Sequence, residues 1–177
     1  MNKIRNREYL LDNIYYIIDN PIVISFTGEH GEGKTTIAYE LMKKYKHSTV
    51  VSLATPVKTI AYMFGYREDE KRTNSKNRTL LEEITMAGFN YDADFWTNKL
   101  TEEIHHRLMY DQTTIFFIDD SQYWQISKSL SEKYKYFREY TFTRENKQSI
   151  IDDIDEYIMN IVNDDFIVLH KLEETNE

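Results

Sequence analysis

The sequence contains no cysteine, and only two prolines and five glycines among its 177 residues. Without cysteine the chain can form no disulfide, no thiolate nucleophile and no Cys-ligated zinc site. No apolar run approaches the roughly 20 residues that span a bilayer, and the first residues lack the apolar segment of a signal peptide. We therefore expect a soluble, cytoplasmic protein that does not enter a membrane.

Basic residues are also fewer than acidic ones, since the chain has 22 lysines and arginines but 30 aspartates and glutamates, which gives a formal net charge of −8. A surface with this balance repels polyanions, so duplex nucleic acid is not an expected partner. Hydrophobic residues at 41% exclude a disordered chain, and the length suits one globular domain. The sequence leaves the oligomeric state open, with a homodimer among the arrangements it allows.

Three of the five glycines fall within six residues. Residues 28–35 read G-E-H-G-E-G-K-T and match the pattern G-x-x-x-x-G-K-[ST]. An apolar, β-branched run at 22–26 precedes this window, and apolar residues at helical spacing follow it from Ile37 onward. A strand before and a helix after form the context in which this pattern binds a nucleoside triphosphate, so we predict a P-loop that binds such a nucleotide. The residues expected to contact the nucleotide are Gly28, Gly31, Gly33, Lys34, Thr35 and Thr36.

The residue types in this loop explain the expected chemistry. Glycines let backbone N–H groups surround a phosphate, and the start of a helix adds partial positive charge. Lys34 would bind the β- and γ-phosphates, and the Thr35 hydroxyl would ligate Mg²⁺. Asp119 and Asp120 directly follow an apolar strand at 113–118, where an acid can hold the Mg²⁺ and its waters. The spacing does not say which of these two carboxylates faces the metal.

Strands and helices alternate along the whole chain, which predicts an α/β fold with a parallel sheet covered by helices on both faces. Apolar runs predict strands at 22–26, 49–53, 113–118, 136–142 and 166–169. Beyond the helix of the P-loop, helical spacing predicts helices at 10–18, 55–64, 80–88, 92–108 and 150–161. We expect Thr55 and Pro56 to begin the second of these five, and Gly65 and Gly88 to follow the ends of the second and third.

The chain lacks the D-x-x-G and N-K-x-D patterns of a regulatory GTPase. A helical insertion after the second strand instead suits a small-molecule kinase, in which a second pocket holds the acceptor and lid arginines stabilise the transferred phosphoryl group.

Three further segments resemble a known family. Residues 52–58 read S-L-A-T-P-V-K with F-G at 64–65, residues 78–82 read R-T-L-L-E, and residues 94–96 read D-F-W. In this order they resemble segments of the deoxynucleoside monophosphate kinases of tailed bacteriophages. The resemblance covers about residues 21–170 and implies an adenylate-kinase-like P-loop kinase fold around a five-stranded parallel sheet.

The resemblance also implies an activity, which is transfer of the γ-phosphate of ATP to a (deoxy)nucleoside monophosphate with Mg²⁺. It implies a single domain with an acceptor-binding helical insertion at about 55–95 and a small lid at about 121–145. Such a protein would work in the host cytoplasm if a phage encodes it. The substrate-binding residues that it implies are Lys58, Arg78, Asp94 and Trp96.

The chain departs from the family at Gln122, which stands where a lid arginine is expected, and a second family arginine is missing from residues 85–90. Glutamine cannot replace a charge-assisted phosphate contact. Either Arg138, Arg144 or one of the lysines at 128, 133 and 135 substitutes, or the activity is weak or redirected. The catalytic residues expected on this basis are Lys34, Asp120, Arg138 and Arg144.

Simpler interpretations stay open for several of these residues. Lys58 and Arg78 also fit as surface charges on amphipathic helices, Asp94 as a helix cap, and Trp96 as a core residue. Two other functions also remain open, a P-loop kinase that acts on a modified base in DNA and a nucleotide-binding module that has lost transfer activity.

Overall fold

The computed structural model describes residues 20–29, 31–68, 75–119 and 124–174, and the side chains among these up to residue 164. The helix expected at 10–18 lies outside these ranges. The elements in chain order are β1 (Ile22–Thr27), α3 (Lys34–Lys44), β2 (Ser48–Val51), α4 (Ala54–Met63), α5 (Ser75–Tyr91), α6 (Phe95–Tyr110), β3 (Ile115–Ile118), α7 (Trp124–Lys133), β4 (Tyr136–Thr141) and α8 (Lys147–Glu174).

Four strands form one sheet in the order β2-β3-β1-β4, and every neighbouring pair is parallel. Ile24 of β1 lies opposite Phe117 of β3 on one side and Arg138 of β4 on the other. The expected α/β class with a parallel sheet between helices is therefore confirmed. Because all strands point the same way, their carboxyl ends meet at one edge, where ligands bind in such sheets.

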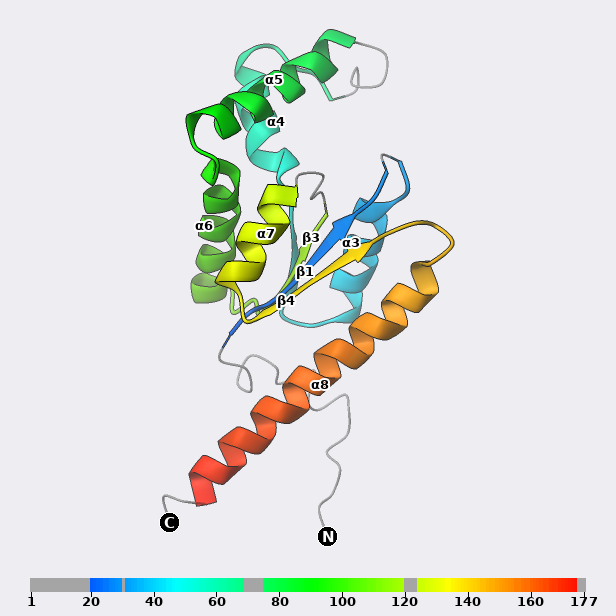
Figure 1. Ribbon diagram of the computed structural model, residues 1–177, viewed down its shortest axis with the longest axis vertical. Helices are drawn as coiled ribbons and strands as arrows, with labels where there is room; N and C mark the ends of the chain where they lie inside the picture. The colour runs from blue at the N-terminus through cyan, green and yellow to red at the C-terminus, as the bar shows by residue number, and fades with distance from the viewer. Residues whose placement is uncertain (1–19, 30, 69–74, 120–123, 175–177) are drawn as a thin grey trace.

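The side chains of β1 alternate between two apolar layers. Ile22, Ile24 and Phe26 pack against α3 and α8, whereas Val23 faces the helices α4, α6 and α7. Figure 1 shows α3 and α8 on one side of the sheet and α6 and α7 on the other, with α4 and α5 above its carboxyl edge. Since β1 is paired on both sides, its run of apolar residues is almost completely buried, as a central parallel strand requires.

The prediction of a fifth strand at 166–169 is wrong, because α8 continues through these residues. Four apolar residues in a row fit a strand and a buried helix equally well. No glycine or proline occurs between residues 147 and 174, so nothing in the sequence ends the helix earlier. Although α8 is 28 residues long, none of the helices in the described part of the chain is apolar enough to cross a membrane.

Two helix ends also differ from expectation. The helix α4 begins at Ala54, whose N–H donates to Ser52 Oγ at 3.2 Å, so Thr55 is not its cap. The expected stop after it is confirmed, since Gly65 adopts a φ of 83° directly beyond the C-cap Phe64. The helix α5, by contrast, runs through Gly88 to Tyr91.

Gly88 lies inside α5 because α6 approaches it closely there. A Cβ at this position would stand 2.4 Å from Nε1 of Trp96, which is fully buried. The Trp96 indole N–H donates to the Thr85 carbonyl at 2.8 Å and so ties α6 to α5. The glycine therefore serves packing between two helices of the insertion and does not end a helix.

We predict that Gly88→Ala destabilises the protein by about 1–3 kcal/mol, since overpacking against the buried indole outweighs the gain of about 1 kcal/mol in helix propensity. Urea denaturation monitored by circular dichroism measures the change. Met86→Ala, at an exposed position of the same helix, should change the free energy of unfolding by less than about 0.5 kcal/mol. A Gly88→Ala protein at least as stable as the parent would contradict this account of the α5–α6 contact.

Candidate functional site

Three glycines with positive φ angles lie in the turn between β1 and α3. Gly28, Gly31 and Gly33 have φ angles of 133°, 88° and 107°, which other residues rarely adopt. A Cβ at Gly28 would meet the Phe142 carbonyl oxygen at 2.4 Å, whereas one at Gly31 would meet nothing within 4 Å. The first glycine therefore lets two backbone segments approach, and the second leaves open space at the mouth of the loop. The expected strand–loop–helix is confirmed.

Lys34, the first residue of α3, folds back over this loop. Its Nζ donates to the carbonyls of Gly28 at 2.9 Å and Glu29 at 2.8 Å, and only 7% of the residue is exposed. The ammonium thus lies within the loop, together with the unpaired N–H groups at the start of a helix. Thr35 and Thr36 follow on the first turn of α3 and are exposed. The ammonium of Lys34 and the start of α3 therefore both contribute positive charge at this loop.

Arg144 is the second cation at the loop. It lies between β4 and α8, and its Nη2 donates to the Gly31 carbonyl at 3.0 Å, while its backbone N–H donates to Glu32 Oε2 at 3.2 Å. The Phe142 N–H donates to the Thr27 carbonyl at 2.8 Å, which extends the β1–β4 pairing to the end of β1 and brings the β4–α8 turn beside the glycine-rich loop. Of the two arginines expected to be catalytic, this one lies at the loop.

Arg138 does not lie at the loop. It points to the opposite face of β4 from Glu139, toward α8, where its Nη2 pairs with Asp153 Oδ2 at 3.2 Å. Its guanidinium also lies over the rings of Tyr140 and Tyr157. Burial raises the pKa of Tyr140, and so does the hydrogen bond that the Tyr140 hydroxyl donates to Asp153, so Tyr140 stays neutral at physiological pH. These contacts give Arg138 a structural role between β4 and α8.

Asp119 supplies the acid at this edge of the sheet. It follows Ile118, which lies opposite Ser25 of β1, and its N–H approaches the Val51 carbonyl of β2 at 3.4 Å. Only 7% of the residue is exposed, and its Oδ1 has no hydrogen-bond partner among the described atoms. A buried carboxylate oxygen without a partner is costly, and a bound cation would satisfy it. Asp120 lies outside the described residues.

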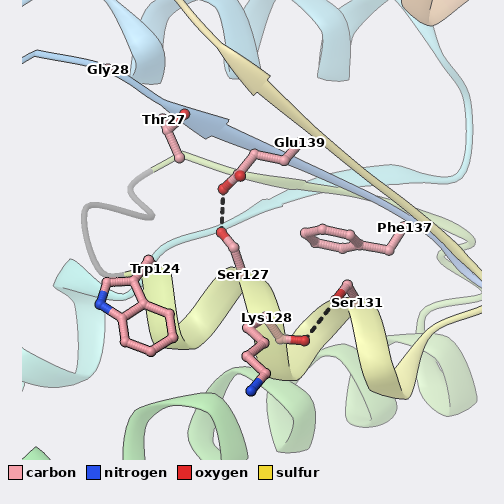
Figure 2. Close-up of a pocket in the computed structure, with 8 residues that line it drawn as sticks. All are labelled: Thr27, Gly28, Trp124, Ser127, Lys128, Ser131, Phe137 and Glu139. Carbon is pink, nitrogen blue, oxygen red and sulfur yellow. Dashed lines mark hydrogen bonds between the residues drawn. The ribbon is translucent and has the colours of Figure 1, made fainter.

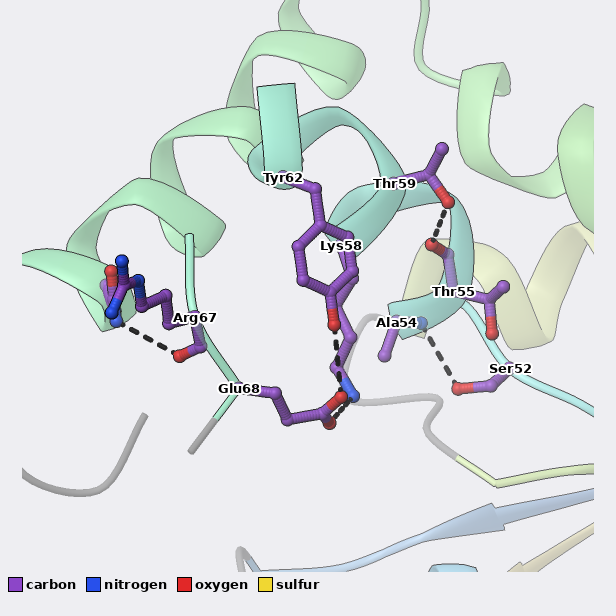
Figure 3. Close-up of polar contacts among 9 residues, drawn as sticks. Ser52, Ala54, Thr55, Lys58, Thr59, Tyr62, Arg67 and Glu68 are labelled. Atoms are coloured by element: carbon purple, nitrogen blue, oxygen red, sulfur yellow. Dashed lines mark hydrogen bonds and ion pairs between the residues drawn. The ribbon is translucent and has the colours of Figure 1, made fainter. Parts of the chain in front are cut away.

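The residues expected to bind the acceptor lie on the helical insertion, apart from the loop. Lys58 pairs with Glu68, which also accepts a hydrogen bond from Tyr62 (Figure 3). Partial burial lowers the pKa of Lys58, but the hydrogen bond and charge of Glu68 outweigh this effect and leave it above its usual value. Arg78 pairs with Glu82 at 3.1 Å on the surface of α5. Both cations therefore already have acidic partners.

The remaining two expected acceptor residues have structural positions. Asp94 is the exposed N-cap of α6, and its own N–H donates to Asp92 Oδ1 at 3.0 Å. Trp96 is 0% exposed and belongs to the apolar layer between the sheet and α6. The core interpretation of Trp96 therefore fits its burial, and stacking on a base would require the insertion to open.

A cavity of about 510 Å³ adjoins the start of the phosphate loop at Thr27 and Gly28. Figure 2 shows it between α7 and the face of β4 that carries Phe137 and Glu139. The sequence analysis did not predict this cavity. The adjacent charged residues Arg138 and Glu139 were a signal, because successive residues of a strand point to opposite faces and each face of β4 therefore carries a charged side chain. The segment expected to be a lid, 121–145, includes α7 and β4, and β4 pairs with β1 in the sheet.

The lysines expected as substitutes for a lid arginine lie on or just after α7. Lys128 lines the cavity, Lys133 donates to Asn98 Oδ1 at 2.9 Å, and Lys135 donates to the Tyr136 hydroxyl at 2.6 Å. Only Lys128 therefore adjoins the region of the loop.

Comparison of the chain with protein-family models, curated proteins and solved structures found no match. The described residues define a protein with a four-stranded parallel α/β sheet and a glycine-rich loop at the carboxyl edge of its central strand.

We predict that Asp119→Asn stabilises the ligand-free protein by about 1–3 kcal/mol, because it removes a buried carboxylate whose Oδ1 has no partner among the described atoms and keeps the shape of the side chain. Urea denaturation in the absence of divalent cations measures this. Asp164→Asn, at an exposed position of α8, should have little effect. Destabilisation by Asp119→Asn would show that the carboxylate has a partner in the folded protein and would contradict its assignment as a cation ligand.

Proposed function

We propose that this protein is a P-loop kinase that transfers the γ-phosphate of ATP to a (deoxy)nucleoside monophosphate in the presence of Mg²⁺. The observation that carries the proposal is the position of Lys34, Arg144 and Asp119, whose Oδ1 has no partner among the described atoms, at one edge of the sheet. Two cations beside a glycine-rich loop suit a polyphosphate, and a buried acid suits the cation that accompanies it. The parallel strand order β2-β3-β1-β4 and the resemblance of residues 52–58, 78–82 and 94–96 to segments of phage deoxynucleoside monophosphate kinases support the same proposal.

Each residue at the loop has a separate task in this proposal. The N–H groups of residues 31–35 and the Lys34 ammonium bind the β- and γ-phosphates, and Arg144 exchanges the Gly31 carbonyl for an oxygen of the transferred group. Thr35 and Asp119 are the described residues that would hold Mg²⁺, which neutralises phosphate charge when bound. Phosphoryl transfer depends mostly on positioning and charge neutralisation, so these contacts supply most of the catalysis.

The acceptor phosphate must compete with acidic side chains of the insertion. Lys58 becomes available when a phosphate displaces Glu68, and Arg78 when one displaces Glu82. The Glu82 pair is mostly exposed and therefore weak.

A nucleotide-binding module without transfer activity is the second candidate function. The observation that favours it is the acidic partner held by each of the cations Lys58, Arg78 and Arg138. Such a module would bind ATP with Mg²⁺ and form no product with any acceptor.

An ADP-release assay with ATP, Mg²⁺ and each common deoxynucleoside monophosphate tests the proposal. We expect turnover above the ATPase background with at least one acceptor and a loss of about 10²–10³-fold in Lys34→Ala, which lacks the ammonium on the phosphates. Lys43→Ala, at an exposed position in the last turn of α3, should retain activity. Binding of ATP without turnover for any acceptor would favour the binding module, and absence of ATP binding would contradict both functions.

Substitution of the two candidate arginines should have different effects on turnover in the same assay. Arg144→Ala is expected to lower kcat by about 10²–10³-fold, since it removes a charge-assisted contact at the phosphate loop. Arg138→Ala should retain most of the turnover and lower the melting temperature, because its contacts are to Asp153 and two tyrosine rings of the β4–α8 layer. The reverse pattern would show that Arg138 leaves α8 to reach the phosphates and would contradict the role given to Arg144.

A further inference from the structure

The cavity between α7 and β4 begins where the phosphate loop begins. Thr27 and Gly28 form part of its wall and also belong to the turn that leads into the loop. Its volume of about 510 Å³ is in the range of sites that hold small molecules. A nucleotide whose base occupies this space would therefore have its phosphates close to the loop.

Aromatic and polar groups meet in this cavity. Trp124, the first residue of α7, exposes 68% of its surface, and Phe137 lies on the strand opposite (Figure 2). A large aromatic side chain in water at the rim of a cavity offers a flat surface on which a base can stack. The Lys128 ammonium points away from β4 and Glu139 in this view, and the other polar side chains that line the cavity are hydroxyl groups.

Glu139 is the acidic side chain among the residues that line this cavity. Strand alternation places it on the α7 face of β4, level with Ser25 of β1, and its Oε1 accepts a hydrogen bond from Ser127 Oγ. An ionised carboxylate has only acceptor sites, so it binds a ligand edge that presents N–H groups. The bond from Ser127 fixes one oxygen and directs the carboxylate toward the cavity.

We infer that this cavity binds the base of a nucleotide and that Glu139 selects bases that present amino N–H donors, an inference that rests on the proposed function. Guanine offers two neighbouring N–H groups to the carboxylate, and adenine and cytosine each offer an amino group. Thymine and uracil place carbonyl oxygens on both sides of their single N–H, and these oxygens repel the carboxylate. The cavity therefore discriminates against thymine and uracil.

Binding measurements with nucleotides of each base test this inference. Calorimetry is performed on the wild-type protein and on Glu139→Gln with dGMP, dCMP, dAMP and dTMP, and separately with non-hydrolysable triphosphates of guanosine and thymidine. We expect the wild type to prefer guanine over thymine by at least tenfold in one of these two series. Glu139→Gln should lose about tenfold to a hundredfold in guanine affinity, the range for a hydrogen bond to a charged group. Glu132→Gln, at an exposed position farther along α7, is the matched control and should bind as the wild type does.

The two series distinguish the acceptor from the donor. If Glu139→Gln lowers guanine affinity only among the monophosphates, the cavity holds the acceptor base. If it lowers guanine affinity only among the triphosphates, the cavity holds the donor base. Equal affinity for all bases, with no effect of Glu139→Gln, would overturn the inference. If Lys34→Ala still abolishes triphosphate binding in that case, the proposed function stands without it, whereas a wild-type protein that binds no nucleotide overturns both.

Tryptophan fluorescence gives an independent readout, because the chain has two tryptophans and Trp96 is fully buried. A base that stacks at the cavity should quench the emission of exposed Trp124, and Trp124→Phe should remove this ligand-dependent signal while the protein stays folded. Quenching that persists in Trp124→Phe would place the base elsewhere and contradict the inference.

Discussion

The double pairing of β1 is the constraint on which the rest of the structure depends. Parallel neighbours on both sides bury β1 almost completely, and their register fixes where its carboxyl end lies relative to the ends of β3 and β4. Because β3 and β4 run in the same direction, Asp119 and the Phe142–Arg144 turn emerge at the same edge. The glycine at position 28 then allows the Phe142 carbonyl to approach, which a side chain there would prevent.

Charge is distributed unevenly around this edge. The chain as a whole is acidic, yet Lys34 and Arg144 both direct their cations at carbonyls of the phosphate loop. Carbonyl groups satisfy a cation only through their dipoles, so an anion with full charge is the stronger partner for both side chains. Lys58 and Arg78, by contrast, already contact glutamates. In the proposed function, an anion at the loop would replace carbonyl contacts, whereas one at the insertion would have to displace a glutamate.

The parts of this fold that could be predicted from sequence are those set by local backbone requirements. A glycine-rich turn between a strand and a helix follows from glycines at fixed spacing, and β1, the positive φ angles of these glycines and α3 confirm it. The end of α5 could not be predicted, because Gly88 responds to Trp96 of another helix, a contact that no local pattern reveals. The apolar run at 166–169 fits helix and strand equally, so the length of α8 required the structure. Arg138 and Arg144 looked equivalent in the sequence. Strand alternation points Arg138 of β4 toward α8, whereas Arg144 lies in the turn after β4, and only the structure shows its contacts with Gly31 and Glu32.

The measurement that tests the central claim most directly is a titration of the ¹⁵N-labelled protein with inorganic triphosphate, followed through its backbone amide resonances. Triphosphate alone isolates the loop from any contribution of a base or an acceptor. The account predicts that the amide protons of Gly31, Gly33, Lys34 and Thr35 show the largest downfield shifts, since these groups would donate to phosphate oxygens. Saturable binding that leaves these four amides unchanged and shifts resonances elsewhere would contradict it.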